Sequence, residues 1–258
     1  MTQHHPWSRL VALGDSFTEG LGDPEPSSPG GHRGWADRVA EVLAEKTESF
    51  AYANLAIRGR QLRQIVAEQF EPALALRPDL VAVSAGGNDI LRPNSDADAL
   101  ANLLETGISR LRLAGATVIL FVGPDLGATP LLGRFRGKFA IYNENLRAIA
   151  QRHDAIIADL WALRELKDNR MWAQDRLHFS PVGHTTIARM VLDALGVDND
   201  LTPFSPEPLP TRTWSQARVD DIGWARDYLM PWAVRHIKHQ SYGDGIAPKR
   251  PGWPSSLV

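Results

Sequence analysis

Short apolar runs alternate with amphipathic segments along most of the chain, and this alternation constrains the fold more than any other feature. The runs are mostly apolar without alternation of apolar and polar residues, as in strands that are buried on both faces. Strands that alternate with helices are typical of a parallel sheet covered by helices on both sides. The five expected strands are residues 10–13, 52–55, 80–83, 118–122 and 155–158.

The segments between these strands carry apolar residues three or four positions apart, the spacing of one face of an α-helix. The apolar faces of the five expected helices lie within residues 35–43, 62–70, 100–111, 139–149 and 187–195. The chain has 258 residues, of which 43% are apolar and 22% charged, so it can bury a full core. Disorder and coiled coil are therefore excluded as descriptions of the whole chain.

The composition changes near residue 198. Residues 198–213 hold four prolines and several acidic residues, which is typical of a linker. We therefore expect a main domain over residues 1–197 and an extension over residues 198–258.

Residues 215–238 in this extension have a helical pattern that Pro231 should kink or end. Large apolar side chains are costly to leave in water, so the extension is expected to pack on the core or on a partner, such as a second copy of the chain in a homodimer. Four of the eight tryptophans lie in it, at Trp214, Trp224, Trp232 and Trp253.

The charge balance and the residue types limit the partners of the protein. Lys and Arg total 28 against 30 Asp and Glu, a net charge of −2, so we expect no nucleic-acid partner. The most apolar stretch, residues 116–122, is too short for stable insertion into a membrane. There is no cysteine, no signal peptide is evident, and no residues show the spacing of metal ligands. A cytoplasmic protein without a metal or cofactor is expected.

Polar residues and glycines follow several of the expected strands, and parallel sheets bind their ligands beyond the carboxyl ends of the strands. Ser16 follows the first strand, Gly59 the second and Asn88 the third, while Asp175 and His178 precede the last helix. We therefore expect these side chains to meet at one rim of the sheet.

A serine, a histidine and a carboxylate at one rim indicate nucleophilic catalysis. A serine hydroxyl needs an adjacent base at neutral pH, and histidine is the usual base. Asp175 lies three residues before His178, so one tight turn brings its carboxylate to Nδ1 and leaves Nε2 to face Ser16. An Asp-x-x-His is expected about 0.6 times by chance, but a Gly-Asp-Ser only about 0.08 times, so the combination carries the signal.

A tetrahedral intermediate also needs hydrogen-bond donors directed at its oxyanion. The candidates are the backbone N–H of Ser16, the backbone N–H of Gly59 and the side-chain amide of Asn88. Asp15 and Asp89 are interpreted as structural supports that bond loop amides near the site. His184 is a second histidine near the last helix, but it falls on the apolar face and is interpreted as a packed residue.

These motifs resemble, in chain order, the sequence blocks of the SGNH hydrolase family, also called GDSL esterases and lipases. The resemblance covers about residues 9–195, and Phe17 stands where leucine is usual. The extension is not part of the family core. The blocks are Gly14-Asp15-Ser16-Phe17, Asn54 with Gly59, Gly86-Gly87-Asn88-Asp89, and Asp175 with His178.

The resemblance implies a three-layer α/β/α fold with a flavodoxin-like five-stranded parallel sheet. It also implies Ser16 as nucleophile, His178 as base and Asp175 as its orienting acid. Gly59 and Asn88 would be oxyanion donors, and residues 1–197 would form a catalytic domain that needs no cofactor.

The function expected from these residues is the hydrolysis of a small carboxylic ester of short to medium acyl chain. Within the family, lysophospholipase, thioesterase and carbohydrate acetyl esterase activities stay open. Outside it, the alternative is a flavodoxin-like module that binds an anion or nucleotide at the same rim. Candidates for an acyl pocket lie in the loop 123–137, at Leu126, Leu131, Leu132 and Phe135.

Overall fold

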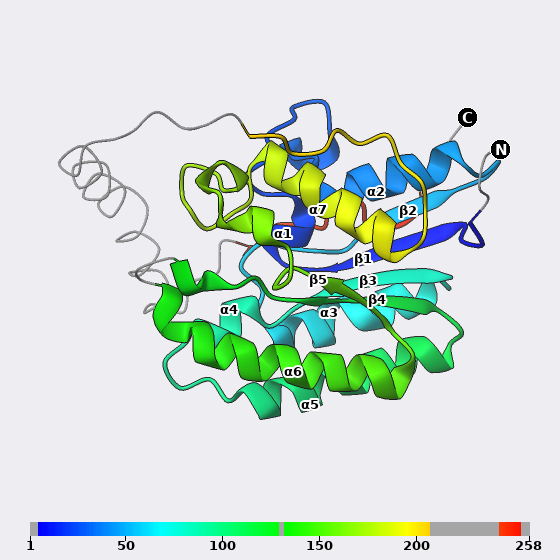
Figure 1. Cartoon of the computed structure of the whole chain (residues 1–258). Helices are drawn as coiled ribbons and strands as arrows, with labels where there is room; N and C mark the ends of the chain where they lie inside the picture. Colours follow the sequence, from blue (N-terminus) through cyan, green and yellow to red (C-terminus); the bar gives the residue numbers. More distant parts are fainter. Residues whose placement is uncertain (1–4, 129–131, 207–242, 254–258) are drawn as a thin grey trace.

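The computed structural model describes residues 5–128, 132–206 and 243–253 (Figure 1). The strands are β1 (Arg9–Gly14), β2 (Ala51–Asn54), β3 (Leu80–Ser84), β4 (Thr117–Val122) and β5 (Ile156–Asp159). The α-helices are α1 (Ser16–Glu19), α2 (Gly34–Glu45), α3 (Leu62–Ala75), α4 (Gly87–Ile90), α5 (Ala97–Leu113), α6 (Arg136–His153) and α7 (Pro181–Ala194). Short 3-10 helices span Pro29–Gly31, Leu126–Ala128, Leu132–Phe135, Arg164–Lys167 and Asn169–Met171.

The five strands form one parallel sheet in the order β2-β1-β3-β4-β5. In this register Leu10 of β1 lies opposite Tyr52 on one side and Leu80 on the other. The strand order reverses between β1 and β3, because the chain first adds β2 on one side of β1 and then continues on the other. Ligands bind to open α/β sheets at such a switch point, beyond the carboxyl ends of the strands.

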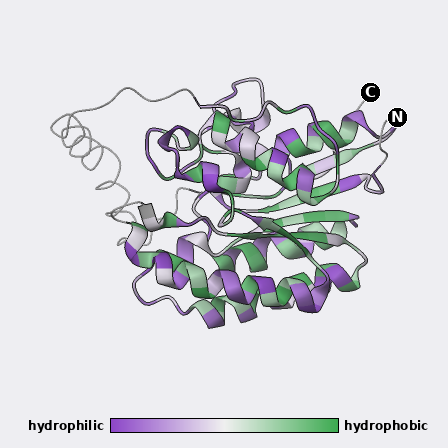
Figure 2. Ribbon diagram, in the orientation of Figure 1, coloured by the Kyte–Doolittle hydropathy of each residue, from purple (hydrophilic) through white to green (hydrophobic). Residues whose placement is uncertain are grey.

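Helices cover both faces of the sheet (Figure 1). Helices α2 and α7 lie on one face, and α3, α5 and α6 lie on the other. Successive β1 side chains contribute alternately to the two cores, with Leu10 and Ala12 on the α2–α7 side and Val11 and Leu13 on the opposite side. Figure 2 shows hydrophobic residues along the strands and hydrophilic ones on the outer helix surfaces. The three-layer α/β/α fold and the five-stranded parallel sheet are confirmed.

Local sequence signals explain where the helices begin. Asp96 caps α5, since its carboxylate accepts from the N–H groups of Asp98 at 3.0 Å and Ala99 at 3.1 Å. Helix α7 begins after Ser180, whose hydroxyl accepts from the N–H of Gly183, and Pro181 occupies its first position. Each cap sets the residue at which its helix begins, close to the carboxyl ends of the strands, where the polar residues lie.

The described residues after 197 pack against the two cores of the sheet. Leu201 and Phe204 pack against the α2–α7 core, and Trp253 packs against the opposite core. The helix expected at 215–238 lies outside the described residues. So do Trp214, Trp224 and Trp232.

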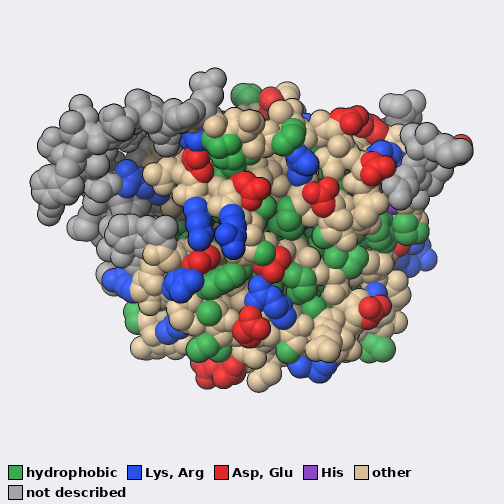
Figure 3. All heavy atoms as spheres, viewed as in Figure 1, with side chains coloured by type: hydrophobic (Ala, Val, Ile, Leu, Met, Phe, Trp, Pro, Cys, Tyr) green, Lys and Arg blue, Asp and Glu red, His purple; other side chains and the backbone are tan. Residues whose placement is uncertain are grey.

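The surface is mixed in charge on the face drawn in Figure 3, where acidic and basic side chains lie intermingled. This agrees with the near balance of 28 basic and 30 acidic residues. Among the residues that the structure describes, none of the helices has the length and apolar character needed to cross a bilayer.

Candidate active site

Ser16 is the first residue of α1, directly beyond the carboxyl end of β1. The turn that presents it is tightly held, because Gln69 bonds both backbone groups of Gly14, each at 2.8 Å. A side chain at Gly14 would bring its Cβ within 2.5 Å of the carbonyl oxygen of Ser84, so only glycine fits between β1 and β3. Asp15 then caps α1 by accepting from the N–H of Phe17 at 3.1 Å.

His178 lies beside Ser16 although 162 positions separate them in the chain. Its Nε2 atom is 3.0 Å from Ser16 Oγ, and its Nδ1 atom is 2.6 Å from Asp175 Oδ2. Because Nδ1 is paired with a carboxylate, that nitrogen carries the proton and Nε2 is left to accept one from the serine. The structure therefore brings together the three residues that the sequence predicted.

The loop that carries Asp175 and His178 is closed on itself. The second carboxylate oxygen of Asp175 accepts the N–H groups of Leu177 and His178, each at 3.0 Å. Arg176 takes the left-handed conformation at φ 54°, which the tight reversal requires. Burial acts to raise the pKa of Asp175, but the hydrogen bond and the charge of His178 lower this pKa below its ordinary value. Asp175 is therefore poised to stabilise a protonated His178.

Residues 58–60 form a turn beyond the end of β2, and we refer to it as the 58–60 turn. Gly59 has a φ of +74°, which favours glycine, and its backbone lines the same cavity as Ser16. Glu19, only 3% exposed, accepts the N–H of Arg58 at 2.7 Å and also pairs with the guanidinium of that residue. The buried carboxylate of Glu19 thus holds the turn from the side of α1.

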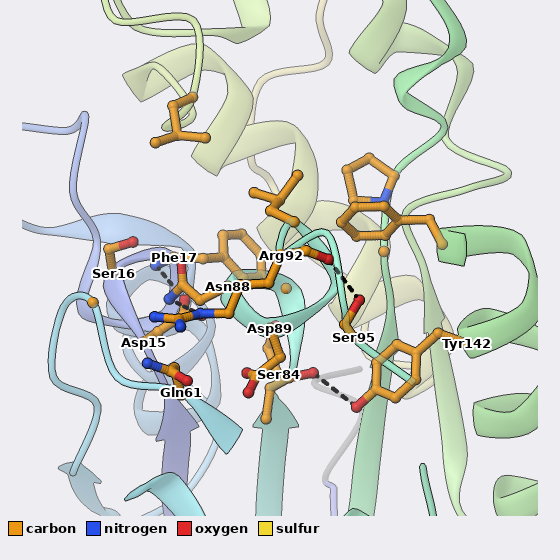
Figure 4. Close-up of a pocket in the computed structure, with 18 of the residues that line it drawn as sticks. Asp15, Ser16, Phe17, Gln61, Ser84, Asn88, Asp89, Arg92, Ser95 and Tyr142 are labelled. Atoms are coloured by element: carbon orange, nitrogen blue, oxygen red, sulfur yellow. Dashed lines mark hydrogen bonds between the residues drawn. The ribbon is translucent and has the colours of Figure 1, made fainter. Parts of the chain in front are cut away.

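Asn88 lies on α4, beyond the end of β3, and faces Ser16 across the switch point (Figure 4). Its amide Nδ2 donates to Asp15 Oδ2 at 3.1 Å and to the carbonyl oxygen of Arg60 at 3.0 Å. These two bonds use both hydrogens of the amide. An anion bound at this point would take over one of the two bonds.

Asp15 and Asp89 both support the loops around the site. Asp15 holds Phe17 and Asn88, as described, and Asp89 Oδ2 accepts the first N–H of α3, at Leu62, at 2.8 Å. Burial raises the pKa of Asp15 to about 6, against bonds and charges that act to lower it. Burial also raises the pKa of Asp89. Each carboxylate is therefore held in place at an energetic cost to the folded protein.

A cavity of about 1410 Å³ opens beside Ser16. Asp15, Ser16 and Asn88 lie at one side of it, while Ser95 and Tyr142 lie at the other (Figure 4). Apart from Ser95, this far side is largely apolar and is built from α5 and α6 together with the loop after β4; its apolar lining consists of Leu100, Leu103, Leu126, Leu132, Phe139, Tyr142 and Leu146. A polar reacting corner thus adjoins an apolar recess.

The loop residues that the sequence suggested for this recess divide into three groups. Leu126 and Leu132 line the cavity. Phe135 is buried in the core on the α6 side and is not among the lining residues, so that expectation was wrong for Phe135. Leu131 lies outside the described residues.

His184, the competing histidine, is completely buried beneath the site. Its Nδ1 accepts the N–H of Trp35 at 3.1 Å, and its Nε2 donates to the carbonyl oxygen of Leu21 at 3.0 Å. Burial lowers its pKa to about 4. Both ring nitrogens are engaged with the backbone, so this residue joins α7 to the first turn of α2 and to the loop after α1.

Sequence reasoning missed Glu19 and Gln69. Each is a buried polar side chain that bonds the backbone of a loop carrying a site residue. A signal for Glu19 was present, because it lies in the same short block as Ser16. Gln69 falls within the apolar pattern of α3 and offers no comparable signal.

Residues 12–186, more than half of the chain, match the GDSL-like Lipase/Acylhydrolase family. The chain belongs to this family of hydrolases, and the resemblance to SGNH hydrolases is confirmed. A relative in Oryza sativa subsp. japonica, the GDSL esterase/lipase WDL1, is 24% identical over 185 residues, which cover 63% of this chain and 70% of that protein.

Solved structures share the fold. LAE5, an alpha/beta hydrolase enzyme from the metagenome of Lake Arreo, Spain, has a TM-score of 0.64 at 23% identity and covers 75% of this chain and 97% of its own. The acetylxylan esterase Axe2 from Geobacillus stearothermophilus has a TM-score of 0.62 at 21% identity, and the match covers 77% of this chain and 98% of Axe2. TesA has a TM-score of 0.61 at 22% identity, and the match covers 73% of this chain and 98% of TesA.

Proposed function

We propose that this chain is a serine esterase that hydrolyses carboxylic esters of short to medium acyl chains through an acyl-enzyme on Ser16. The observation that carries the proposal is the continuous contact from Ser16 Oγ to His178 Nε2 at 3.0 Å and from His178 Nδ1 to Asp175 at 2.6 Å. Nucleophile, base and orienting acid within hydrogen-bond reach are the arrangement that acyl transfer requires.

In the first half of the reaction, Ser16 Oγ attacks the acyl carbon and its proton moves to His178 Nε2. The oxyanion is stabilised by the backbone N–H groups of Ser16 and Gly59 and by the amide of Asn88. The tetrahedral intermediate collapses, and the alcohol leaves with the proton from His178. In the second half, water attacks the acyl-enzyme, gives a proton to His178, and the acid leaves as Ser16 regains its hydrogen.

The apolar recess supports an acyl chain of limited length. Phe139, Tyr142 and Leu146 lie on one face of α6 and all line the cavity. Leu146 lies seven positions after Phe139, which corresponds to about 10 Å at the helical rise. This is roughly the length of an extended octanoyl chain, so the recess suits short to medium acyl groups.

The acetyl esterase alternative is favoured by one observation, the structural similarity to the acetylxylan esterase Axe2. A series of p-nitrophenyl esters separates the two possibilities. A maximum of kcat/KM with the butyryl to octanoyl esters supports the esterase proposed above. A maximum with the acetyl ester and a steady decrease thereafter would instead support an acetyl esterase. A parallel series of thioesters tests for a thioesterase.

The central experiment is covalent labelling with a fluorophosphonate. We expect the label on Ser16, and Ser16→Ala should lose both the label and the hydrolysis of p-nitrophenyl butyrate while it keeps its circular dichroism spectrum. Ser49→Ala changes an exposed serine and serves as the control. An active Ser16→Ala variant would refute the assignment. An unlabelled wild-type protein that retains a nucleotide on purification would favour the binding module instead.

A further inference from the structure

Residues 243–253, which we call the C-terminal segment, return to the edge of the sheet and contact the 58–60 turn. We propose that the C-terminal segment is a positioning element of the oxyanion site. This inference rests on the proposed function, because it concerns the same reaction. It assigns a role in catalysis to residues that lie far beyond the stretch 12–186 that matches the family.

The C-terminal segment is joined to the sheet at its β2 edge. Arg250 forms an antiparallel bridge with Asn54, the last residue of β2. The N–H of Asn54 donates to the carbonyl oxygen of Arg250 at 2.9 Å, and the N–H of Arg250 donates back at 3.3 Å. This bridge lies just before the 58–60 turn, so it fixes where the C-terminal segment can reach.

The buried side chain of Lys249 is a second anchor of the C-terminal segment, next to the bridge at Arg250. Its side chain is only 1% exposed, and its ammonium donates to the Asp37 carboxylate at 2.5 Å. It also donates to the carbonyl oxygens of His32 at 3.0 Å and Arg33 at 3.1 Å. All three hydrogens of the ammonium are therefore satisfied, as a buried charge requires. The anchor sets the register of the neighbouring residues.

Gly243 and Asp244 then contact the 58–60 turn directly. A Cβ at Gly243 would lie 2.3 Å from the carbonyl oxygen of Arg58, so the two backbones are in close contact. Asp244 Oδ1 accepts from Arg60 Nη1 at 3.1 Å, and Asp244 also lines the cavity. The Arg60 side chain is 13% exposed and pairs with Glu68 of α3 at 2.8 Å as well. Arg60 is thus held between α3 and the C-terminal segment.

This contact reaches two of the three proposed oxyanion donors. Gly59 lies between Arg58 and Arg60, so its N–H is directed by the turn that the C-terminal segment touches. The carbonyl oxygen of Arg60 accepts from the Asn88 amide at 3.0 Å and thereby orients it. A small displacement of the turn would move both donors, and a misplacement of about 1 Å at a catalytic group can reduce the rate a hundredfold.

A matched pair of glycine substitutions tests this role. Gly243→Ala places a methyl group against the Arg58 carbonyl, whereas Gly252→Ala, in the same segment, meets its nearest side chain only at 4.0 Å. Neither glycine has the positive φ that would strain an alanine. Asp244→Asn is the second variant, because it removes the ion pair to Arg60 without adding bulk. We measure kcat and KM with p-nitrophenyl butyrate, the rate of fluorophosphonate labelling, and hydrogen exchange of the amides at 58–60.

We expect Gly243→Ala to lower kcat and the labelling rate about tenfold, with little change in KM. The same variant should speed hydrogen exchange of the amides in the 58–60 turn. Gly252→Ala should match the wild type in all of these measurements. Asp244→Asn should change the same quantities in the same direction by a smaller factor. Faster exchange with unchanged kcat and labelling would overturn the proposal, since the contact would then be structural only. Unchanged exchange and kcat in both variants would overturn it as well. A wild type without esterase activity or labelling would refute the proposed function, whereas an active wild type with an unaltered Gly243→Ala would refute only the role of the C-terminal segment.

Discussion

Asn88 is the side chain in which the support of the site and its proposed chemistry meet. Its amide is held by Asp15 on one side and by the Arg60 carbonyl on the other. The amide is therefore held in position before any substrate is bound, and in the proposed reaction it exchanges one of these two bonds for a bond to the oxyanion.

At this residue, Asn88→Ala removes the amide and should lower kcat about 10²- to 10³-fold with a smaller change in KM, because an oxyanion donor acts mainly in the transition state. Steady-state kinetics with a p-nitrophenyl ester measure both quantities. Asn102→Ala, an exposed asparagine on α5, is the control. An unchanged kcat in Asn88→Ala would remove this residue from the proposed mechanism.

Asp15 should make the stability of the protein depend on pH. Its pKa is about 6 in the folded protein against 3.8 ordinarily, so between these values the folded state binds a proton that the unfolded chain has lost. Stability from this group is therefore present below the lower value and is lost as the pH rises to about 6, by on the order of 3 kcal/mol.

Asp15→Asn removes this titration. Chemical denaturation between about pH 4 and pH 7 should show the variant gaining stability relative to the wild type as the pH rises, with a plateau above about pH 6. A difference in unfolding free energy that stays constant over this range would contradict the raised pKa of Asp15.

At the scale of elements, α5 and α6 act as the two walls of the apolar recess. Lys138 on α6 holds the loop after α4 in place, donating to the carbonyl oxygens of Arg92 at 3.2 Å, Pro93 at 2.6 Å and Ser95 at 3.2 Å. The wall beside the reacting corner is thus tied to the same helix that supplies Phe139, Tyr142 and Leu146.

Leu103 lines the recess from α5 and offers a test of its length. Leu103→Trp should fill the far end and exclude about two methylene groups, each contributing about 0.8 kcal/mol. We expect kcat/KM for the octanoyl ester to fall about tenfold relative to the acetyl ester. Asn102→Trp places the same bulk at a neighbouring exposed position as a control. An unchanged chain-length profile in Leu103→Trp would place the acyl group elsewhere.

The elements were predictable from the sequence because the forces that form them are local. Continuous apolar runs located all five strands to within a residue or so, since strands buried on both faces contain few polar residues. The chain order of Ser16, Asn88 and His178 located the rim, because parallel strands deliver their carboxyl ends to one edge. Gln69 could not be predicted, since its partner Gly14 is 55 positions away and the residue lies within the apolar pattern of α3, whereas Glu19 was missed although it lies in the same short block as Ser16.

At the scale of the whole molecule, the contacts by which the C-terminal segment docks could not be predicted, although the sequence led us to expect that residues 198–258 pack on the core or on a partner. Its docking depends on polar contacts of Lys249 and Arg250 and on close backbone packing at Gly243, and none of these produces a periodic apolar pattern. Only its single tryptophan, Trp253, gave a signal of burial, and the structure packs that residue against the core.

The anchor of this segment should contribute to global stability. Lys249→Met leaves the buried Asp37 carboxylate without its main partner and should lower the free energy of unfolding by about 3 kcal/mol. Chemical denaturation measures the loss. Lys167→Met, at an exposed lysine, is the control, and the double variant Lys249→Met, Asp37→Asn should recover part of the loss. A single variant as stable as the wild type would show that the ion pair contributes nothing net.

The bridge between Asn54 and Arg250 also bears on how the protein acquires its activity. The entropy of closing a chain loop grows with its length, so a contact across most of the sequence forms later than the pairing of neighbouring strands. During refolding, the sheet and both helical layers would then assemble while the turn beside the nucleophile is still unbraced. Activity would then return later than secondary structure, and the delay would measure the time that the bridge between Asn54 and Arg250 takes to form.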